Sequence, residues 1–253
     1  MRRRILAVLA VAGTVAAVLA APTVGAAAET CVITPVKISA GCSGALIENS
    51  RSGRVALLVG GRRLDFANKN QVRAENCADR PVHRVTAAAY DAVPAGPDPL
   101  YAAQTRDVAV ERITPTPAYR PNCRPLYRLD GRDPKIVFDA GFAPKDPVNG
   151  QYDLAAYVAH NQPSPFVSTT YDFTLYKQWK SPWEYVLDAP GGIDVNETIG
   201  YDHKYANQQE VAFPGGLATR FIMEACPVRQ PERIVDTAHC VGNPHYAPWR
   251  NAA

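Results

Sequence analysis

Six cysteines, all after residue 30, are the strongest constraint on how this 253-residue chain folds. None belongs to a Cys-x-x-Cys pair, and His239 beside Cys240 lacks the spacing of a zinc site. An even number of cysteines without such spacing favours disulfides, so we expect no metal site. Six cysteines allow many pairings, of which we expect Cys31–Cys42, Cys77–Cys123 and Cys226–Cys240. The second bond would tie the front of the chain to its later part.

The first residues have the pattern of a secretion signal. Three arginines, Arg2 to Arg4, precede an apolar stretch from Ile5 to Leu19, and Ala26-Ala27-Ala28 offers a cleavage site with small residues. The sequence therefore predicts a signal peptide over residues 1–28 and a secreted, extracellular protein that begins near Glu29. A transmembrane anchor is the alternative, but the apolar run is short and rich in small residues. We expect a monomer that does not associate with a membrane.

The charge balance argues against a protein that wraps a long nucleic-acid duplex. The chain has 27 Lys and Arg against 24 Asp and Glu, and three of the arginines lie in the leader, so the remainder has no net charge. Residues 30–122 carry 12 basic and 8 acidic side chains, whereas residues 124–253 carry 12 and 15. Neutralising many phosphates requires a large positive excess. The balance therefore favours an acceptor that is small or locally exposed.

The chain divides into a front module, a connecting segment and a larger second part. Residues 29–93 are predicted to form a β-rich module, because β-branched runs alternate with Gly, Asn and Ser. Prolines crowd residues 94–122, which predicts a linker or strap, although residues 106–113 have a strand-like pattern. Residues 123–253 are predicted as a mixed α and β domain, with helices at 133–138 and 153–160 and strands at 166–170, 184–187, 210–213 and 221–225.

Three short segments of the second part carry the groups needed to break a bond at a phosphate-linked sugar. Arg128 would bind paired phosphate oxygens through its guanidinium, although a surface salt bridge with Asp130 or Asp133 is the alternative. Glu210 would stabilise positive charge that develops on the sugar. Ser168 would orient that carboxylate, and both residues have the alternative of an ordinary exposed strand position.

Gln208 lies two residues before Glu210 in a Gln-x-Glu pattern. Side chains two residues apart on a strand share a face, so we expect the amide to lie beside the carboxylate and to face the acceptor.

From about Leu126 to Pro227 the chain resembles the cholera- and pertussis-type ADP-ribosyltransferases. It is most similar to the pierisin and scabin branch, which modifies guanine in DNA or in smaller nucleotides. The resemblance rests on Leu126–Asp130 and Phe166–Thr170 and on two longer runs, Ala-Pro-Gly-Gly-Ile-Asp-Val-Asn at 189–196 and Gln-Gln-Glu-Val-Ala-Phe-Pro-Gly-Gly at 208–216. It covers less than half of the chain, and residues 30–122 match no known motif. It implies an α+β fold of two packed antiparallel sheets with flanking helices, plus the small β-rich N-terminal segment.

The resemblance also implies the roles of individual residues. NAD would be the co-substrate, and no metal would be needed. Tyr205 stands where guanine-modifying relatives can carry an aromatic residue for base stacking, and simple packing is the alternative for both Tyr205 and Trp179. Relatives that modify arginine place a glutamate at the position of Gln208, so arginine is not the expected acceptor. The implied catalytic residues are Glu210, Gln208 and Ser168, and the implied NAD-binding residues are Arg128, Thr169, Asn161 and Trp179.

The leading hypothesis is a secreted mono-ADP-ribosyltransferase whose acceptor is guanine in nucleic acid or in a nucleotide. Two alternatives keep the same site and replace the acceptor with a non-arginine protein side chain or with water, as in an NAD glycohydrolase. A third alternative is a secreted binding module that is held together by disulfides. The sequence does not distinguish duplex DNA, single strands, RNA and free nucleotides.

Overall fold

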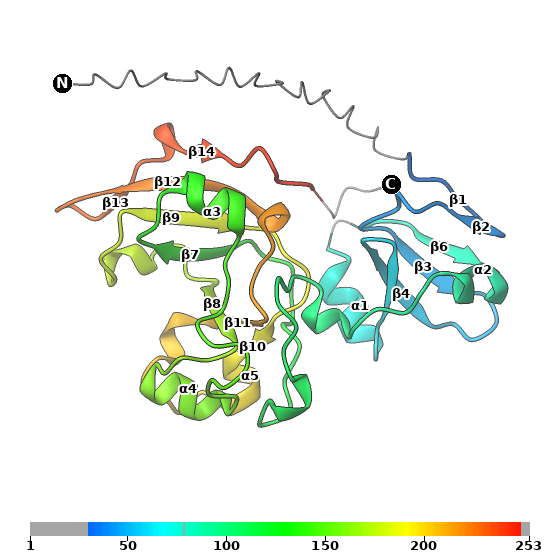
Figure 1. Cartoon of the computed structure of the whole chain (residues 1–253), viewed down its shortest axis with the longest axis horizontal. Coiled ribbons are helices and arrows are strands. Elements are labelled where there is room, and N and C mark those ends of the chain that lie inside the picture. The colour runs from blue at the N-terminus through cyan, green and yellow to red at the C-terminus, as the bar shows by residue number, and fades with distance from the viewer. Residues whose placement is uncertain (1–29, 78, 249–253) are drawn as a thin grey trace, which may run out of the picture.

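The structure is a computed structural model that describes residues 30–77 and 79–248, so the predicted signal peptide lies outside the described residues. Figure 1 shows a smaller lobe, formed by the first strands and helices, beside a larger lobe that contains the remaining strands. Among the described residues, no helix is both long and apolar enough to cross a membrane.

The smaller lobe is a four-stranded sheet with two short helices. The strand order is β5-β4-β3-β6, in which β3 and β6 are parallel and the other pairs are antiparallel. Asn68 and Thr86 cap the two helices through their side chains, which is the usual reason for a helix to begin at such residues. The elements are β3 (Leu46–Asn49), β4 (Val55–Val59), β5 (Arg62–Asp65), α1 (Lys69–Glu75), β6 (Val82–Val85) and α2 (Ala87–Ala92), preceded by the hairpin of β1 (Ile33–Thr34) and β2 (Lys37–Ile38).

The larger lobe contains two antiparallel groups of strands that meet at one residue pair. One group has the order β10-β11-β8 and the other β7-β9-β12-β13, with β14 also on β12. Strands β7 and β8 pair only through Tyr127 and Thr170, so the groups diverge beyond that point. The strands are β7 (Leu126–Asp130), β8 (Phe166–Thr170), β9 (Trp183–Leu187), β10 (Ile193–Asp194), β11 (Glu210–Pro214), β12 (Ile222–Arg229), β13 (Ile234–Val235) and β14 (Val241–Gly242).

Three helices flank these strands, as Figure 1 shows. They are α3 (Pro134–Ala140), α4 (Leu154–His160) and α5 (Val195–Ile199). The first two coincide closely with the predicted helices, because Asp133 and Asp153 cap their starts and Gly141 and Asn161 end them with positive φ angles. The predicted fold class, an α+β ADP-ribosyltransferase fold with a small β-rich N-terminal part, is confirmed.

The segment of residues 94–122, here called the strap, runs over the larger lobe without forming a regular strand. The strand-like pattern of residues 106–113 does not form a strand: this stretch contains a 3₁₀ turn, Val110–Arg112. The apolar residues of this stretch pack into a core cluster with α4, β10 and β11. Their side chains do not alternate between two faces, as those of a strand in a sheet would. The strap is fastened at Gly215, whose carbonyl accepts hydrogen bonds from the backbone N–H groups of Thr105 (2.9 Å) and Arg106 (3.0 Å).

The two lobes share a hydrophobic core. Leu46 and Leu57 of the smaller sheet belong to the same buried cluster as Leu126 and Leu187 of the larger one. Polar contacts reinforce this junction, where the buried Glu75 accepts a hydrogen bond from the Gly191 N–H (2.8 Å) and another from the Tyr119 hydroxyl.

All three predicted disulfide pairs are present in the structure. Their Cα–Cα distances are 4.4 Å for Cys31–Cys42, 6.0 Å for Cys77–Cys123 and 4.1 Å for Cys226–Cys240. The predicted boundaries of the front module and of the strap stay predictions.

Candidate active site

A single cavity collects all of the residues that the sequence suggested for the site. It lies where β7 and β8 diverge, and its volume is about 360 Å³. That volume falls in the range of roughly 300–1,000 Å³ that is usual for small-molecule sites. The predicted residues that line it are Arg128, Asn161, Ser168, Thr169, Trp179, Tyr205, Gln208 and Glu210.

Arg128 lies on β7 and is held from two sides. Its Nη1 donates a hydrogen bond to the backbone carbonyl of Ser168 (2.6 Å), and its Nε and Nη2 donate to Asp130 (3.3 and 3.2 Å). The predicted alternative of an ion pair with Asp130 is therefore real, but it does not remove Arg128 from the cavity. Both Nη atoms carry a second N–H group, which leaves donors for an anionic ligand.

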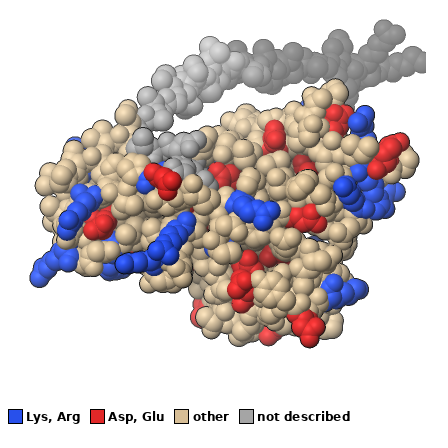
Figure 2. Space-filling view, turned by 180° about the vertical axis from the view of Figure 1, so that it is seen from behind, with Lys and Arg blue, Asp and Glu red and all other residues tan. Residues whose placement is uncertain are grey.

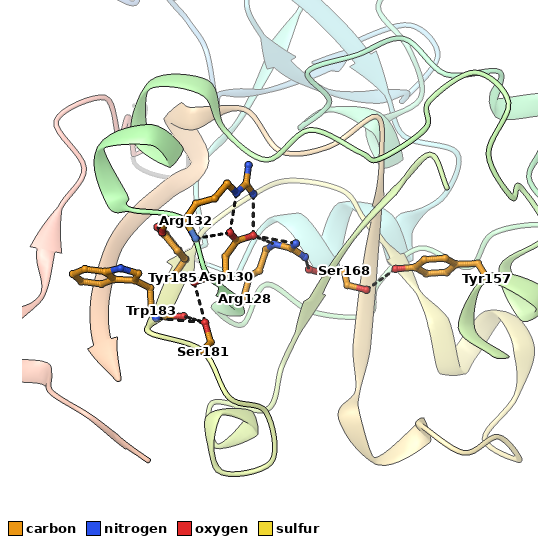
Figure 3. Close-up of polar contacts among 8 residues, drawn as sticks. All are labelled: Arg128, Asp130, Arg132, Tyr157, Ser168, Ser181, Trp183 and Tyr185. Atoms are coloured by element: carbon orange, nitrogen blue, oxygen red, sulfur yellow. Dashed lines mark hydrogen bonds and ion pairs between the residues drawn. The ribbon is translucent and has the colours of Figure 1, made fainter. Parts of the chain in front are cut away.

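Asp130 is the common partner of two arginines, Arg128 and Arg132, which converge on it in Figure 3. Burial alone would raise the pKa of this carboxyl, but the hydrogen bonds from Arg132 and the charges of both arginines outweigh burial and hold the pKa below its usual value. Asp130 is thus a stable anion that fixes the direction of the Arg128 guanidinium.

Glu210 opens β11 and faces two hydroxyl groups. Its Oε1 accepts hydrogen bonds from the Ser168 hydroxyl and from the Tyr157 hydroxyl (3.3 Å). Those two hydroxyls also contact each other at 2.7 Å, a contact that is visible in Figure 3. Burial raises the pKa of Glu210, while both hydrogen bonds and the charge of Arg128 act in the opposite direction. The expected contact between Ser168 and Glu210 is therefore present.

Tyr157 is a site residue that our sequence reasoning missed. In the sequence it occupies one of the regularly spaced apolar positions of α4, which indicated only a packing role. The structure shows that it is indeed buried. It stands four residues before Asn161, however, and residues four apart lie on the same face of a helix. That spacing could have placed its hydroxyl at the same cavity, which Tyr157 and Asn161 both line.

Gln208 reaches the cavity in a different way from the one predicted. It ends the 3₁₀ turn Ala206–Gln208, and Gln209 has a φ of +47°, in the left-handed region. The expected strand alternation between Gln208 and Glu210 is therefore wrong, because β11 begins only at Glu210. The reversal at Gln209 nevertheless brings both side chains to the same cavity.

Thr169 has its side chain committed to the fold. Its Oγ1 donates a hydrogen bond to the Val211 carbonyl (2.8 Å), and the residue is almost fully buried. It therefore connects β8 to β11 beside Ser168. Its small exposed surface forms part of the cavity wall.

The remaining predicted residues stand around the opening. Trp179 is 48% exposed, and Asn161 is exposed at the end of α4. Tyr205 is partly exposed, and the Lys204 ammonium lies 4.9 Å from the centre of its ring. A flat aromatic face beside a cation suits a planar, anionic ligand such as a nucleotide.

The described residues contain one group that resembles a set of metal ligands, Glu224 with Cys226 and Cys240. Its two sulfur atoms form a disulfide and offer no thiolate, so the group does not fit a metal ion.

Comparisons with known proteins match this half of the chain. Residues 126–246 match a family model described as scabin-like. The chain is 54% identical over 162 residues to a guanine-specific ADP-ribosyl transferase of Streptomyces coelicolor, a match that covers 62% of this chain and 79% of that protein. This match is longer than the segment from Cys123 to the C-terminus, so it includes part of the strap.

Two further similarities agree with it. The structure of the scabin toxin from Streptomyces scabies in complex with NADH has a TM-score of 0.58 and 56% identity, and covers 60% of this chain and 93% of that one. Pierisin of Pieris brassicae is 37% identical over 115 residues, which are 40% of this chain but only 13% of that protein.

Proposed function

Because the chain belongs to the scabin-like family of ADP-ribosyltransferases, we propose that it cleaves NAD and transfers the ADP-ribose to a guanine base. The observation that carries this proposal is the cavity that joins Arg128, Ser168 and Glu210, since these residues supply a phosphate-binding cation and an oriented carboxylate. Its size suits a small molecule, and the NADH complex of scabin indicates which one.

Arg128 and Glu210 would divide the work on NAD between them. Arg128 would bind the pyrophosphate through its remaining N–H groups. Glu210 would face the ribose next to nicotinamide, where its negative charge stabilises the positive charge that builds up as the bond breaks. Ser168 and Tyr157 would hold the carboxylate in place, so it needs no rearrangement at the moment of reaction.

The transfer replaces one carbon–nitrogen bond with another. The bond between ribose C1′ and nicotinamide breaks, and its electron pair leaves with the nicotinamide nitrogen. A guanine nitrogen then donates a pair to C1′ and loses its proton to water. Tyr205 would stack on the guanine and Gln208 would contact its edge, since an amide can both donate and accept hydrogen bonds.

One assay tests this proposal. The intact protein is incubated with NAD and, in separate reactions, with DNA, guanosine, guanine nucleotides, the other nucleosides and a mixture of proteins. We expect an added ADP-ribose mass only on guanine-containing acceptors. If no guanine species gains this mass, the acceptor assignment fails; modified polypeptides would then indicate a protein acceptor, and free ADP-ribose alone an NAD glycohydrolase. The absence of any NAD consumption would indicate a binding module.

We infer further that the protein acts outside the cytoplasm, as a monomer that needs neither a membrane nor a metal ion. Three disulfides and the signal-like start of the sequence support secretion. On the surface shown in Figure 2, acidic and basic side chains are interspersed, which is typical of a solvated face.

Removal of metal ions tests the last part of this inference. Because the required charges come from Arg128 and Glu210, we expect EDTA to leave NAD cleavage unchanged. A loss of NAD cleavage that added Mg²⁺ or Zn²⁺ restores would contradict this.

A further inference from the structure

The residues proposed to meet the acceptor lie on a loop that has little structure of its own. This loop, residues 200–209, connects α5 to β11 and carries both Tyr205 and Gln208. Its last two residues are joined to the end of β8, since the Thr170 hydroxyl donates a hydrogen bond to the Gln208 carbonyl and the Tyr171 N–H donates one to the Gln209 carbonyl (3.2 Å). Before them the backbone forms short-range turns, such as the Gln208 N–H to the Tyr205 carbonyl (2.9 Å) and the Ala206 N–H to the His203 carbonyl (3.1 Å). Such turns alone do not fix where the part of the loop that carries Tyr205 stands relative to the rest of the site.

One buried residue, Asn196, contacts the loop at three points. Its backbone carbonyl accepts a hydrogen bond from the Gly200 N–H (2.9 Å) at the start of the loop. Its side-chain Nδ2 donates to the Ala206 carbonyl (2.9 Å), and its Oδ1 lies 2.8 Å from Nε2 of His203. Asn196 is only 6% exposed, so these contacts are shielded from water.

The chemistry of these contacts fixes the direction of every donor. The Ala206 carbonyl can only accept, so the amide nitrogen of Asn196 must face it and the amide oxygen must face His203. His203 therefore donates from Nε2, which places the proton of the neutral ring on that nitrogen. Its Nδ1 is buried and has no hydrogen-bond partner among the described residues, so Asn196 is the side chain that orients this ring.

Asn196 is itself anchored to the strand that carries the catalytic carboxylate. It lies on α5, which Asp194 caps by accepting a hydrogen bond from the Glu197 N–H (3.0 Å). Asp194 also pairs with Val211 on β11, next to Glu210. Contacts made by Asn196 therefore link residues 200–206 of the loop to the strand of Glu210. Neither Asn196 nor His203 lines the cavity.

We propose that Asn196 and His203 are positioning residues that hold Tyr205, and the turn leading from it to Gln208, for the transfer step and are dispensable for the cleavage of NAD. This inference rests on the proposed function. It gives a role to Asn196, the last residue of the Ala-Pro-Gly-Gly-Ile-Asp-Val-Asn run, although Asn196 does not line the cavity.

The test compares transfer with NAD hydrolysis in the same variants. For Asn196→Ala and His203→Ala, we expect the KM for guanosine to rise and transfer to fall ~10-fold or more, since misplacement by about 1 Å can cost on the order of 10²-fold. NAD hydrolysis without acceptor should stay within about twofold of wild type. His203→Gln keeps an N–H near the position of Nε2 and should restore most of the transfer. Asn149→Ala, on an exposed loop, is the matched control.

Limited digestion with trypsin gives a second readout that needs no acceptor. Lys204 is exposed on the loop and Lys177 is exposed elsewhere. We expect both alanine variants to be cut faster after Lys204 and equally fast after Lys177. If wild type cleaves NAD but modifies no guanine, the proposed function fails, while this digestion still decides whether Asn196 and His203 hold the loop.

Three kinetic results would overturn the inference: equal losses of transfer and hydrolysis, no loss of either, or a His203→Gln variant as impaired as His203→Ala. Unchanged digestion after Lys204 would also overturn it. Should Asn196→Ala fail to fold, the less buried His203 carries the test through its alanine and glutamine variants.

Discussion

Two opposing influences act on the carboxyl group of Glu210. Its burial raises its pKa, yet two hydroxyl groups and a nearby arginine favour the ionised form. A carboxylate in such surroundings interacts strongly with a positive charge that develops close to it, because little water is present to screen the interaction.

Replacing Glu210 with glutamine therefore tests charge separately from shape. The amide has nearly the same volume but no negative charge, so we expect NAD hydrolysis to fall about 10²–10³-fold with little change in folding. The release of nicotinamide from NAD measures the effect, and a melting curve checks the fold. Hydrolysis that stays near the wild-type rate would show that the charge of Glu210 is not used.

Tyr157 offers a test that depends on pH. Its hydrogen bond lowers the pKa of Glu210, so Tyr157→Phe raises that pKa. A larger fraction of Glu210 is then protonated at a given acidic pH, and the acidic limb of the rate profile should move to higher pH. At the plateau we expect a loss of roughly tenfold to a hundredfold, the contribution of one hydrogen bond to a charged group. An unshifted profile of NAD hydrolysis would argue against this role.

The identity of most site residues could be predicted from the sequence, because Arg128, Ser168 and Glu210 occur in recognisable runs. Tyr157 could not be found in the same way, since a tyrosine at an apolar helix position looks like a packing residue. The contact of its hydroxyl with Ser168, where α4 lies against β8, shows that it faces the cavity.

Local backbone geometry explains where the predictions of elements failed. The Gln-x-Glu pattern predicted a continuous strand, but the left-handed conformation of Gln209 separates a 3₁₀ turn from β11. The strand-like pattern in the strap has another origin: Val108, Val110 and Ile113 are apolar because they pack in the core cluster that contains α4, and their spacing imitates a strand. The helices α3 and α4 were predictable because their end signals are local.

The loop before β10 is an element whose conformation only glycine permits. Gly191 has a φ of +76°, and a Cβ there would lie 2.5 Å from the carbonyl oxygens of both Pro99 and Leu100 in the strap. We therefore expect Gly191→Ala to destabilise the protein by about 1–3 kcal/mol. Chemical denaturation measures this change, and Gly131→Ala, where a Cβ meets nothing within 4 Å, is the matched control. Equal effects of the two substitutions would contradict the argument.

If the hydrophobic core shared by the two lobes stabilises both of them, the whole molecule should unfold in one cooperative transition. No sequence pattern indicated that Leu46 and Leu57 pack with Leu126, because such a contact depends on how two sheets meet. Apart from the strap, the sequence predicted one link between the parts, the disulfide Cys77–Cys123.

Glu75 provides the corresponding test. Glu75→Ala leaves the Gly191 N–H and the Tyr119 hydroxyl without their acceptor at a buried junction, so we expect a loss of about 2–4 kcal/mol. The melting temperature should fall by on the order of 10 °C, and both lobes should still unfold in one transition. Two separate transitions in calorimetry would mean that the lobes are independent.

The same junction determines when the protein can finish folding. The bond from Gly191 to Glu75 spans 116 residues and that from Thr105 to Gly215 spans 110. A ribosome therefore completes the front sheet long before the partners of its apolar face exist, and contacts of such long sequence separation form slowly. Until then Leu46 and Leu57 remain open to association with other chains. The nascent polypeptide must be kept apart from its neighbours until its last strands have been made.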